Sequence, residues 1–203
     1  DLCKPAAVSA ILEEAAGRFG PVRTLIHNPR EVRPIRVEDG DESLFLRLLD
    51  VHAKSAFVCT QAVGRQMAAA GRGSIIYAGS IHAEKPTGSS FAYSVSQGAV
   101  KMLAKEAALE LGRSGVRVNT IEMGPVLGDD GLFRSDVATQ YVQYRYKVPN
   151  AEPGGFEDLA ECAWFLASES ARYVNGADLR VDGGFVLHYL DHKMKRDEPH
   201  PER

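Results

Sequence analysis

The chain has 203 residues, of which 44% are hydrophobic and 25% are charged, with a formal net charge of -3 at pH 7. These values are typical of one globular domain, and without a basic excess they give no reason to propose nucleic acid or an anionic membrane as partner. No apolar run approaches ~18 residues, and the first residues lack the basic and apolar regions of a signal sequence. Three scattered cysteines, without a CxxC pair or a Cys/His cluster, favour reduced thiols, a cytoplasmic setting and no metal site.

The first part of the chain alternates helical and strand patterns. Apolar side chains recur every three or four positions over residues 6–19, which predicts a helix, and residues 22–27 form a β-prone run that ends at Asn28 and the proline after it. A polar loop leads to one long helix predicted over residues 42–70. A glycine-rich break then precedes a buried strand over residues 74–80.

The second part continues the alternation. A helix is predicted over residues 93–111, a strand over 116–123, a helix over 156–167 and a last strand within 177–184. Helices and strands that alternate with short connections indicate parallel strands. The fold class is therefore α/β, with a doubly wound, Rossmann-like parallel sheet.

Three polar side chains meet where the strand over residues 74–80 ends. Ser80 would lie at the carboxyl end of a parallel strand, where open α/β sheets bind ligands. Tyr93 and Gln97 lie four positions apart on one face of the next helix. A hydroxyl, a phenol and an amide in one neighbourhood make a candidate proton-transfer site.

This spacing resembles the short-chain dehydrogenase/reductase family, whose site has a Ser, a Tyr thirteen positions later and a Lys four positions after the Tyr. Ser80 and Tyr93 match, whereas Gln97 stands at the Lys position. In the family the Tyr exchanges a proton as hydride passes to or from a nicotinamide, the Ser holds the carbonyl oxygen, and the Lys holds the ribose and lowers the Tyr pKa. The resemblance implies NAD or NADP as cofactor and a small carbonyl compound or alcohol as substrate.

Other positions match in part. Asn28 remains from the family's Asn-Asn-Ala-Gly segment on the adenosine side of the cofactor, whereas Arg30 stands at the Gly. His52 replaces an Asn whose backbone holds a water of the proton relay. An imidazole there could join the relay, or it could be a helix histidine with a satisfied ring; both alternatives are open. The loop beside the nicotinamide is matched by Gly124, Pro125 and Val126.

The remaining matches concern structure and assembly. Asn119 matches a family Asn, with an expected structural role, and the Val-Asp-Gly-Gly turn near residue 184 matches closely. The strand before this turn commonly packs across a two-fold axis in family tetramers, so the resemblance implies a homo-oligomer. The segment over residues 130–150 corresponds to the substrate lid. Its aromatic residues could contact a ring-bearing substrate or pack within the lid. They are Phe133, Tyr141, Tyr144 and Tyr146.

The resemblance predicts a single domain over residues 1–187 and a charged tail over residues 188–203 that we expect to be mobile. The family's first strands and its Thr-Gly-x-x-x-Gly-x-Gly turn, which holds the pyrophosphate at a helix N-terminus, have no counterpart in this sequence. About 60 residues of the usual fold are absent at ~30 per strand-helix unit. We therefore expect a fragment of a longer protein, rather than a remnant stabilised by association.

Gln97 is the departure with the largest chemical consequence. A cation ~4.5 Å from the phenol contributes about 3.7 kcal/mol at an effective dielectric of ~20, whereas a neutral hydrogen bond contributes ~1 kcal/mol. The phenolate fraction should fall by about two orders of magnitude. Three functions follow: an oxidoreductase with an impaired site, a non-catalytic relative that acts as a binding or oligomer partner, and, least supported, a cofactor-independent lyase like the halohydrin dehalogenases.

Overall fold

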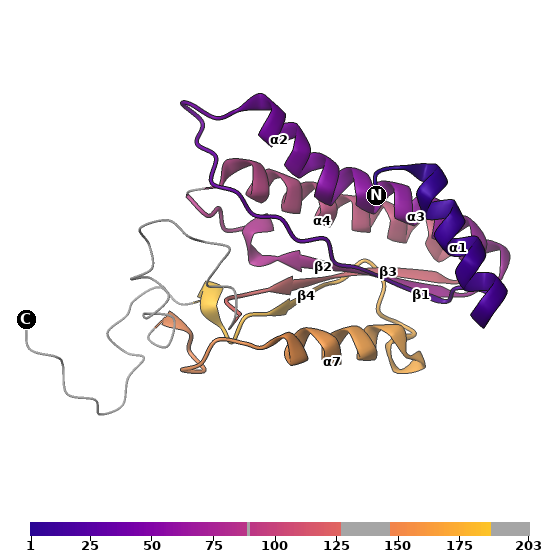
Figure 1. Cartoon of the computed structure of the whole chain (residues 1–203). Coiled ribbons are helices and arrows are strands. Elements are labelled where there is room, and N and C mark those ends of the chain that lie inside the picture. Colours follow the sequence, from indigo (N-terminus) through magenta and orange to yellow (C-terminus); the bar gives the residue numbers. More distant parts are fainter. Residues whose placement is uncertain (89, 127–146, 188–203) are drawn as a thin grey trace, which may run out of the picture.

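The computed structural model describes residues 1–88, 90–126 and 147–187 (Figure 1). In this part of the chain the strands form one sheet, in which all neighbours are parallel and follow the order of the sequence. The strands are β1 (Thr24–His27), β2 (Gly73–Ser80), β3 (Val116–Met123) and β4 (Asp178–Val181). The predicted α/β fold with a parallel sheet is thus confirmed.

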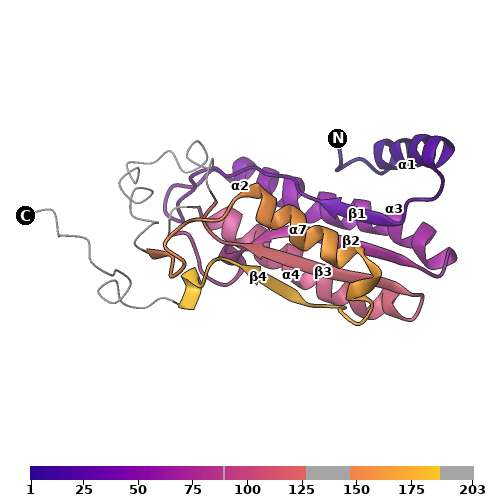
Figure 2. The ribbon, with the colours of Figure 1, turned by 90° about the horizontal axis from the view of Figure 1, so that it is seen from below.

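Helices cover both faces of this sheet. One face of the described sheet is covered by α1 (Pro5–Phe19), α2 (Glu42–Leu49), α3 (Ser55–Ala69) and α4 (Phe91–Gly112), as Figure 1 shows. Helix α7 (Phe156–Ala167) lies on the opposite face, and Figure 2 views the sheet from that side.

The buried strand β2 shows why both layers are needed. Successive side chains of a strand point to opposite faces, so Ile75 and Tyr77 pack into the core beneath α3 and α4, whereas Ile76 packs toward α7 with Leu166. All four side chains are fully buried. Burial on both faces explains why this strand is an almost continuous apolar run in the sequence.

The pairing of β2 with β3 brings their carboxyl ends level. Gly73 lies opposite Val116 at the start, and Ser80 lies opposite Met123 at the end. The loop that begins at Gly124 therefore starts beside Ser80. This alignment is what brings the predicted Ser and the predicted nicotinamide loop together.

The helix predicted over residues 42–70 differs from the structure in its middle. A π-helical turn, Asp50–Lys54, joins α2 to α3. The Ser55 hydroxyl donates a hydrogen bond to the Val51 carbonyl four residues earlier, and such side-chain bonds compete with the backbone ladder and bend helices. His52 lies within this turn.

The last strand, β4, ends at Val181, and the predicted turn follows it. Gly183 and Gly184 in that turn have φ values of 58° and 85°, which favour glycine. Asn119 on β3 has the structural role expected of it. Its amide donates to the Val174 carbonyl at 3.0 Å, and its Oδ1 accepts from the Ala177 N–H at 2.9 Å. These bonds attach the approach to β4 to the centre of the sheet.

The lid aromatics Phe133, Tyr141, Tyr144 and Tyr146 lie outside the described residues, and so does the charged tail over residues 188–203. In the described ranges, no helix combines the length and the apolar character that crossing a membrane requires.

Candidate active site

A cavity of about 270 Å³ opens at the carboxyl ends of the strands. The ends of β1 and β2, the first turns of α4 and the loop after β3 all contribute to its wall. Seven of the eight predicted site residues line it, and they come from segments up to a hundred residues apart. These are Asn28, Ser80, Tyr93, Gln97, Gly124, Pro125 and Val126.

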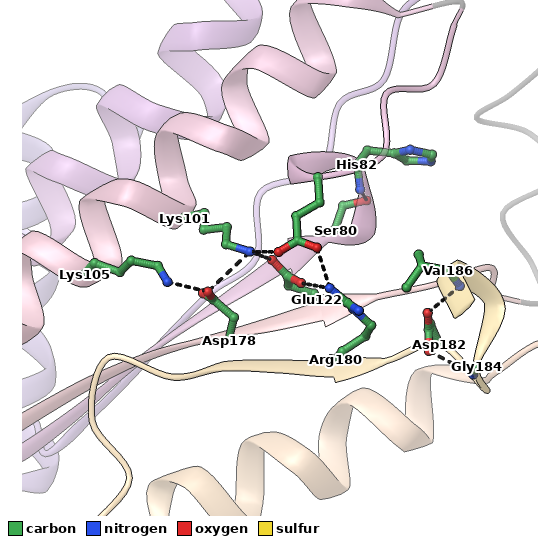
Figure 3. A network of polar contacts seen from close by, with 11 residues as sticks. Ser80, His82, Lys101, Lys105, Glu122, Asp178, Arg180, Asp182, Gly184 and Val186 are labelled. Carbon is green, nitrogen blue, oxygen red and sulfur yellow. Dashed lines mark hydrogen bonds and ion pairs between the residues drawn. The ribbon is translucent and has the colours of Figure 1, made fainter. Parts of the chain in front are cut away.

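Ser80 and Tyr93 lie close to each other in the wall of this cavity. Ser80 is the last residue of β2, and its Oγ accepts a hydrogen bond from the His82 N–H at 3.1 Å, as Figure 3 shows. The Ser80 hydroxyl lies near enough to the Tyr93 phenol to lower the pKa of the phenol. A carbonyl oxygen that entered between them would meet two hydroxyl groups.

The environment of Tyr93 keeps its phenol protonated. Burial raises the pKa of the phenol, while the hydrogen bond from Ser80 and the charge of Arg30 act in the opposite direction without overcoming burial. Tyr93 can therefore donate a proton at neutral pH, but its phenolate fraction is low. A low phenolate fraction limits the reverse use of Tyr93 as a base.

Gln97 lies one helical turn after Tyr93 and is 6% exposed. Its amide lies close to the backbone of β2, since a Cβ atom built on Gly79 would come within 3.9 Å of Gln97 Oε1 and within 2.8 Å of Thr120 Cγ2. The glycine thus leaves room at the floor of the cavity. The group at this floor is a neutral amide.

His52 lies beneath the cavity rather than in its wall. The ring is 1% exposed and meets the Tyr93 ring edge-on, with 5.5 Å between the ring centroids. Nε2 accepts from the Glu31 N–H at 3.4 Å, so Nδ1 carries the proton and faces Ser96 Oγ at 2.9 Å. Burial lowers the pKa of His52. Both ring nitrogens have protein partners, and a role in the relay stays a prediction.

Arg30 is a cavity residue whose contacts the sequence did not indicate. Its guanidinium carbon lies 5.6 Å from the centroid of the Phe156 ring, at the start of α7. Lys85 also lines the cavity, and none of the described lining residues is a carboxylate. The wall is therefore cationic.

Comparisons with known proteins show the family of the chain. A family model described as Enoyl-(Acyl carrier protein) reductase matches residues 1–186. The chain belongs to the short-chain dehydrogenase/reductase family. Momilactone A synthase of Oryza sativa subsp. japonica is 33% identical over 193 residues, which cover 92% of this chain and 70% of that protein. The 3-alpha-(or 20-beta)-hydroxysteroid dehydrogenase of Mycobacterium bovis is 31% identical over 186 residues, which cover 92% of this chain and 69% of that protein.

A solved structure extends the comparison to three dimensions. The crystal structure of a gluconate 5-dehydrogenase from Burkholderia cenocepacia J2315, in complex with NADP and tartrate, is similar with a TM-score of 0.85 and 28% sequence identity. The match covers 93% of this chain and 74% of that one. The oxidoreductase lineage of the chain follows from these relatives and from the family model.

One turn beyond the family's Lys position, α4 carries a lysine that is already engaged. Lys101 Nζ lies 2.6 Å from Glu122 Oε1 and 3.3 Å from Asp178 Oδ2. Burial lowers the pKa of Lys101, but its hydrogen bonds to Glu122 and Glu84 outweigh burial and raise the pKa above its usual value. Lys101 is thus held at the sheet and does not replace the missing cation.

Lys101 is the centre of a larger cluster that we call the ion-pair network (Figure 3). Its three acidic and three basic side chains join α4, the turn after β2, and strands β3 and β4. They are Glu84, Lys101, Lys105, Glu122, Asp178 and Arg180. Equal numbers of the two charges allow Glu122, which is 1% exposed, to lie inside the sheet.

A second buried histidine lies at the end of β1. His27 is 4% exposed, its Nε2 lies 2.9 Å from Ser55 Oγ, and its ring meets Tyr77 edge-on. Burial, and next the charge of His52, lower the pKa of His27 to about 4. His27 is therefore a neutral, structural residue at pH 7.

The groups present in the cavity fit the nicotinamide-ribose half of a dinucleotide. The amides of Asn28 and Gln97 can donate to and accept from ribose hydroxyls, and the cationic wall suits a negatively charged cofactor. No glycine-rich strand-to-helix turn occurs in the described ranges, which hold no counterpart of the family's pyrophosphate cradle. Within the same ranges, no group of three or more His, Cys, Asp or Glu residues is placed to hold a metal ion.

Proposed function

We propose that this chain is an oxidoreductase that transfers a hydride between NAD or NADP and a small carbonyl compound or alcohol, at a rate limited by Gln97. The observation that carries the proposal is that Ser80 and Tyr93 line one cavity together with the loop after β3, with Ser80 near enough to lower the pKa of the Tyr93 phenol. The family membership supports the class of reaction, and the geometry supports the assignment of the residues.

In the direction of reduction, the side chains act on the carbonyl oxygen. The Ser80 hydroxyl donates a hydrogen bond to that oxygen and holds the carbonyl beside Tyr93. A nicotinamide held here would be the source of the hydride. Tyr93 gives its phenolic proton to the oxygen, so the carbonyl becomes an alcohol and a phenoxide remains on Tyr93. Water then returns a proton to the phenoxide.

The cofactor would be held by groups of this chain on two sides of the cavity. Asn28 comes from the end of β1, and Gly124, Pro125 and Val126 come from the loop after β3. Gln97 would meet the ribose from α4 with a hydrogen bond of net ~1 kcal/mol, without the charge of a lysine. We therefore expect weaker retention of the cofactor than in relatives that have the lysine.

The experiment is a titration of the protein with NADH and NADPH, followed by cofactor fluorescence, and then turnover of a panel of aldehydes and ketones. We expect binding and slow reduction that Tyr93→Phe abolishes and that Ser80→Ala lowers by about a hundredfold or more. Phe at position 93 keeps the ring against His52, so it is a matched control for folding. The proposal would be contradicted if the protein bound neither cofactor and reduced no member of the panel.

A non-catalytic role as a binding or oligomer partner is the second candidate, and a face of α4 favours it. Large apolar side chains lie at intervals of four and seven along the helix and are 39–78% exposed, which is unusual for a monomer surface. They are Phe91, Val95, Met102 and Leu109. We infer a homo-oligomer through this face, which both candidate functions permit. Light scattering of the native chain and of Leu109→Glu would show whether a dimer or tetramer forms and whether this variant dissociates it.

A further inference from the structure

We propose that Arg30 is the cation of this active site: from the loop after β1, its guanidinium supplies to Tyr93 the positive charge that the family's Lys would supply from position 97. This inference rests on the proposed function, because it assigns a part of the same site. Arg30 acts through Tyr93: its positive charge favours the ionised form of the Tyr93 phenol. It does not give or take the transferred proton.

The geometry places Arg30 in the right cavity. Arg30 and Tyr93 both line it, on walls that come from β1 and from α4. The guanidinium lies over the Phe156 ring, 5.6 Å from its centroid, which is a favourable cation–π contact. Pro29, whose ring fixes its own φ, precedes Arg30 and restricts the loop. The cation is therefore held by an aromatic ring on one side and a stiff backbone on the other.

No other described cation that lies near the site can take this part. Lys101 is one turn too far along α4, and Glu122 and Asp178 already neutralise it. Lys85 lines the cavity from the exposed loop after β2, and the charge that acts on the Tyr93 phenol is that of Arg30.

The chemistry of an arginine differs from that of a lysine in a way that can be measured. A guanidinium stays protonated at every accessible pH, so it offers Tyr93 a constant positive field. When a carbonyl oxygen takes the phenolic proton, the phenoxide left behind lies in this field. Arg30 is exposed, and solvent screens exposed pairs, so its effect is smaller than that of a buried lysine.

The first test compares two changes at one position. Arg30→Gln removes the charge and should lower kcat for reduction at neutral pH about two- to fivefold, with little change in KM. In the direction of alcohol oxidation, the rise of the rate with pH should move to higher pH. Arg30→Lys keeps the charge and should retain both the rate and the pH profile. Loss confined to KM, or equal loss in both variants, would overturn the inference, because it would mean that Arg30 binds substrate.

The second test needs no turnover. Tyrosine labelled with ¹³C at Cζ reports phenol ionisation by NMR, and the signal of Tyr93 is identified by its loss in Tyr93→Phe. We expect the Tyr93 titration to move to higher pH in Arg30→Gln and to stay in place in Arg30→Lys and in the matched cation control Lys85→Gln.

The two tests separate the inference from the proposed function. A shifted Tyr93 titration in Arg30→Gln with no reduction of any carbonyl compound would refute the function and leave the assignment of Arg30. Reduction by the native chain with an unmoved titration would refute the assignment and leave the function.

Discussion

Gln97 and Lys101 occupy successive turns of one helix, but the charged side chains around the two positions differ. At Gln97 the helix faces a cavity whose described wall has cations and no carboxylate. At Lys101 it faces the ion-pair network, in which each charge has a partner of opposite sign. Lys101 is therefore close to the site in sequence, but its charge is paired with carboxylates of the network and does not act in the cavity.

The two regions also differ in why their charges are present. Glu122 is fully buried in β3 and would be costly without its cations, so the network is required by the fold. The cations of the cavity compensate no described carboxylate in its wall, so packing does not require them. A cationic cavity wall beside a phenol and a hydroxyl is what function, rather than stability, would select.

Removal of Lys101 tests the structural side of this comparison with the largest effect. Lys101→Met leaves Glu122 without its nearest cation, and breaking a buried pair in this way costs about 3–5 kcal/mol of unfolding free energy. Urea denaturation measures it. The control is Lys105→Met on the same helix, because Lys105 pairs with Asp178 and its side chain is 41% exposed; this variant should cost less than about 1 kcal/mol. Equal losses in the two variants would mean that burial of Glu122 is not what the network supports.

Acid titration tests the buried, neutral His27 at the end of β1. The pKa of His27 is lowered from 6.5 to about 4 in the folded chain, so below pH 6.5 the unfolded chain binds a proton that the folded chain does not. Stability is therefore fully present above about pH 6.5, falls by about 3 kcal/mol as the pH drops toward 4, and levels below that value. The midpoint of urea unfolding should fall less between pH 6.5 and 4 in His27→Gln than in the native chain. An identical pH dependence in the two proteins would show that His27 titrates normally.

A charge placed at the cavity tests the functional side. Gln97→Lys should raise the reductase rate by up to about a hundredfold, since a cation beside Tyr93 stabilises the phenoxide by about 2–3 kcal/mol more than an amide does. Steady-state kinetics with the best substrate of the panel measures the gain. Gln97→Met keeps the size of the side chain without a charge and should give no gain. An unchanged rate in Gln97→Lys would mean that another group, such as Arg30 or His52, already fills the role.

The smallest expected effect belongs to the residue that links the two regions. Glu84 lies four residues after Ser80 and pairs with Lys101 and Arg180, but it is 42% exposed. Glu84→Gln should therefore cost less than about 1 kcal/mol and leave the kinetics of Ser80 and Tyr93 unchanged. A drop in kcat beyond the loss in stability would show that the ion-pair network also acts on the cavity.

The sequence predicted the cavity better than the network, for a physical reason. Ser80, Tyr93 and Gln97 lie within one strand-turn-helix unit, so their spacing along the chain sets their spacing in the fold. The hydrophobic period likewise predicted the helices and strands that pack around them. The π-helical turn was missed because a single Ser55 side-chain bond disturbs the ladder without altering the apolar pattern.

The network and Arg30 depend on segments that meet only in the folded chain. The sequence signal for the network was Glu122, a carboxylate within a predicted strand, because a buried charge is stable only when it is paired. Its cations come from 21 residues earlier, at Lys101, and from Arg180 near the other end of the chain. Arg30 stood out only as a departure from a family glycine, and its contact with Phe156 required the tertiary structure.

The π-helical turn at residues 50–54 sets the rotational phase between α2 and α3. Such a turn takes in one residue more than an α-turn, so every side chain after it is rotated by about 100° relative to an unbroken α-helix. Leu48 before it and Ala56 after it are both completely buried, which fixes that phase from both sides. Deleting a single residue within this turn would therefore rotate one helix relative to the other. One of the two helices would have to expose its apolar stripe, although every other residue of the sequence was retained.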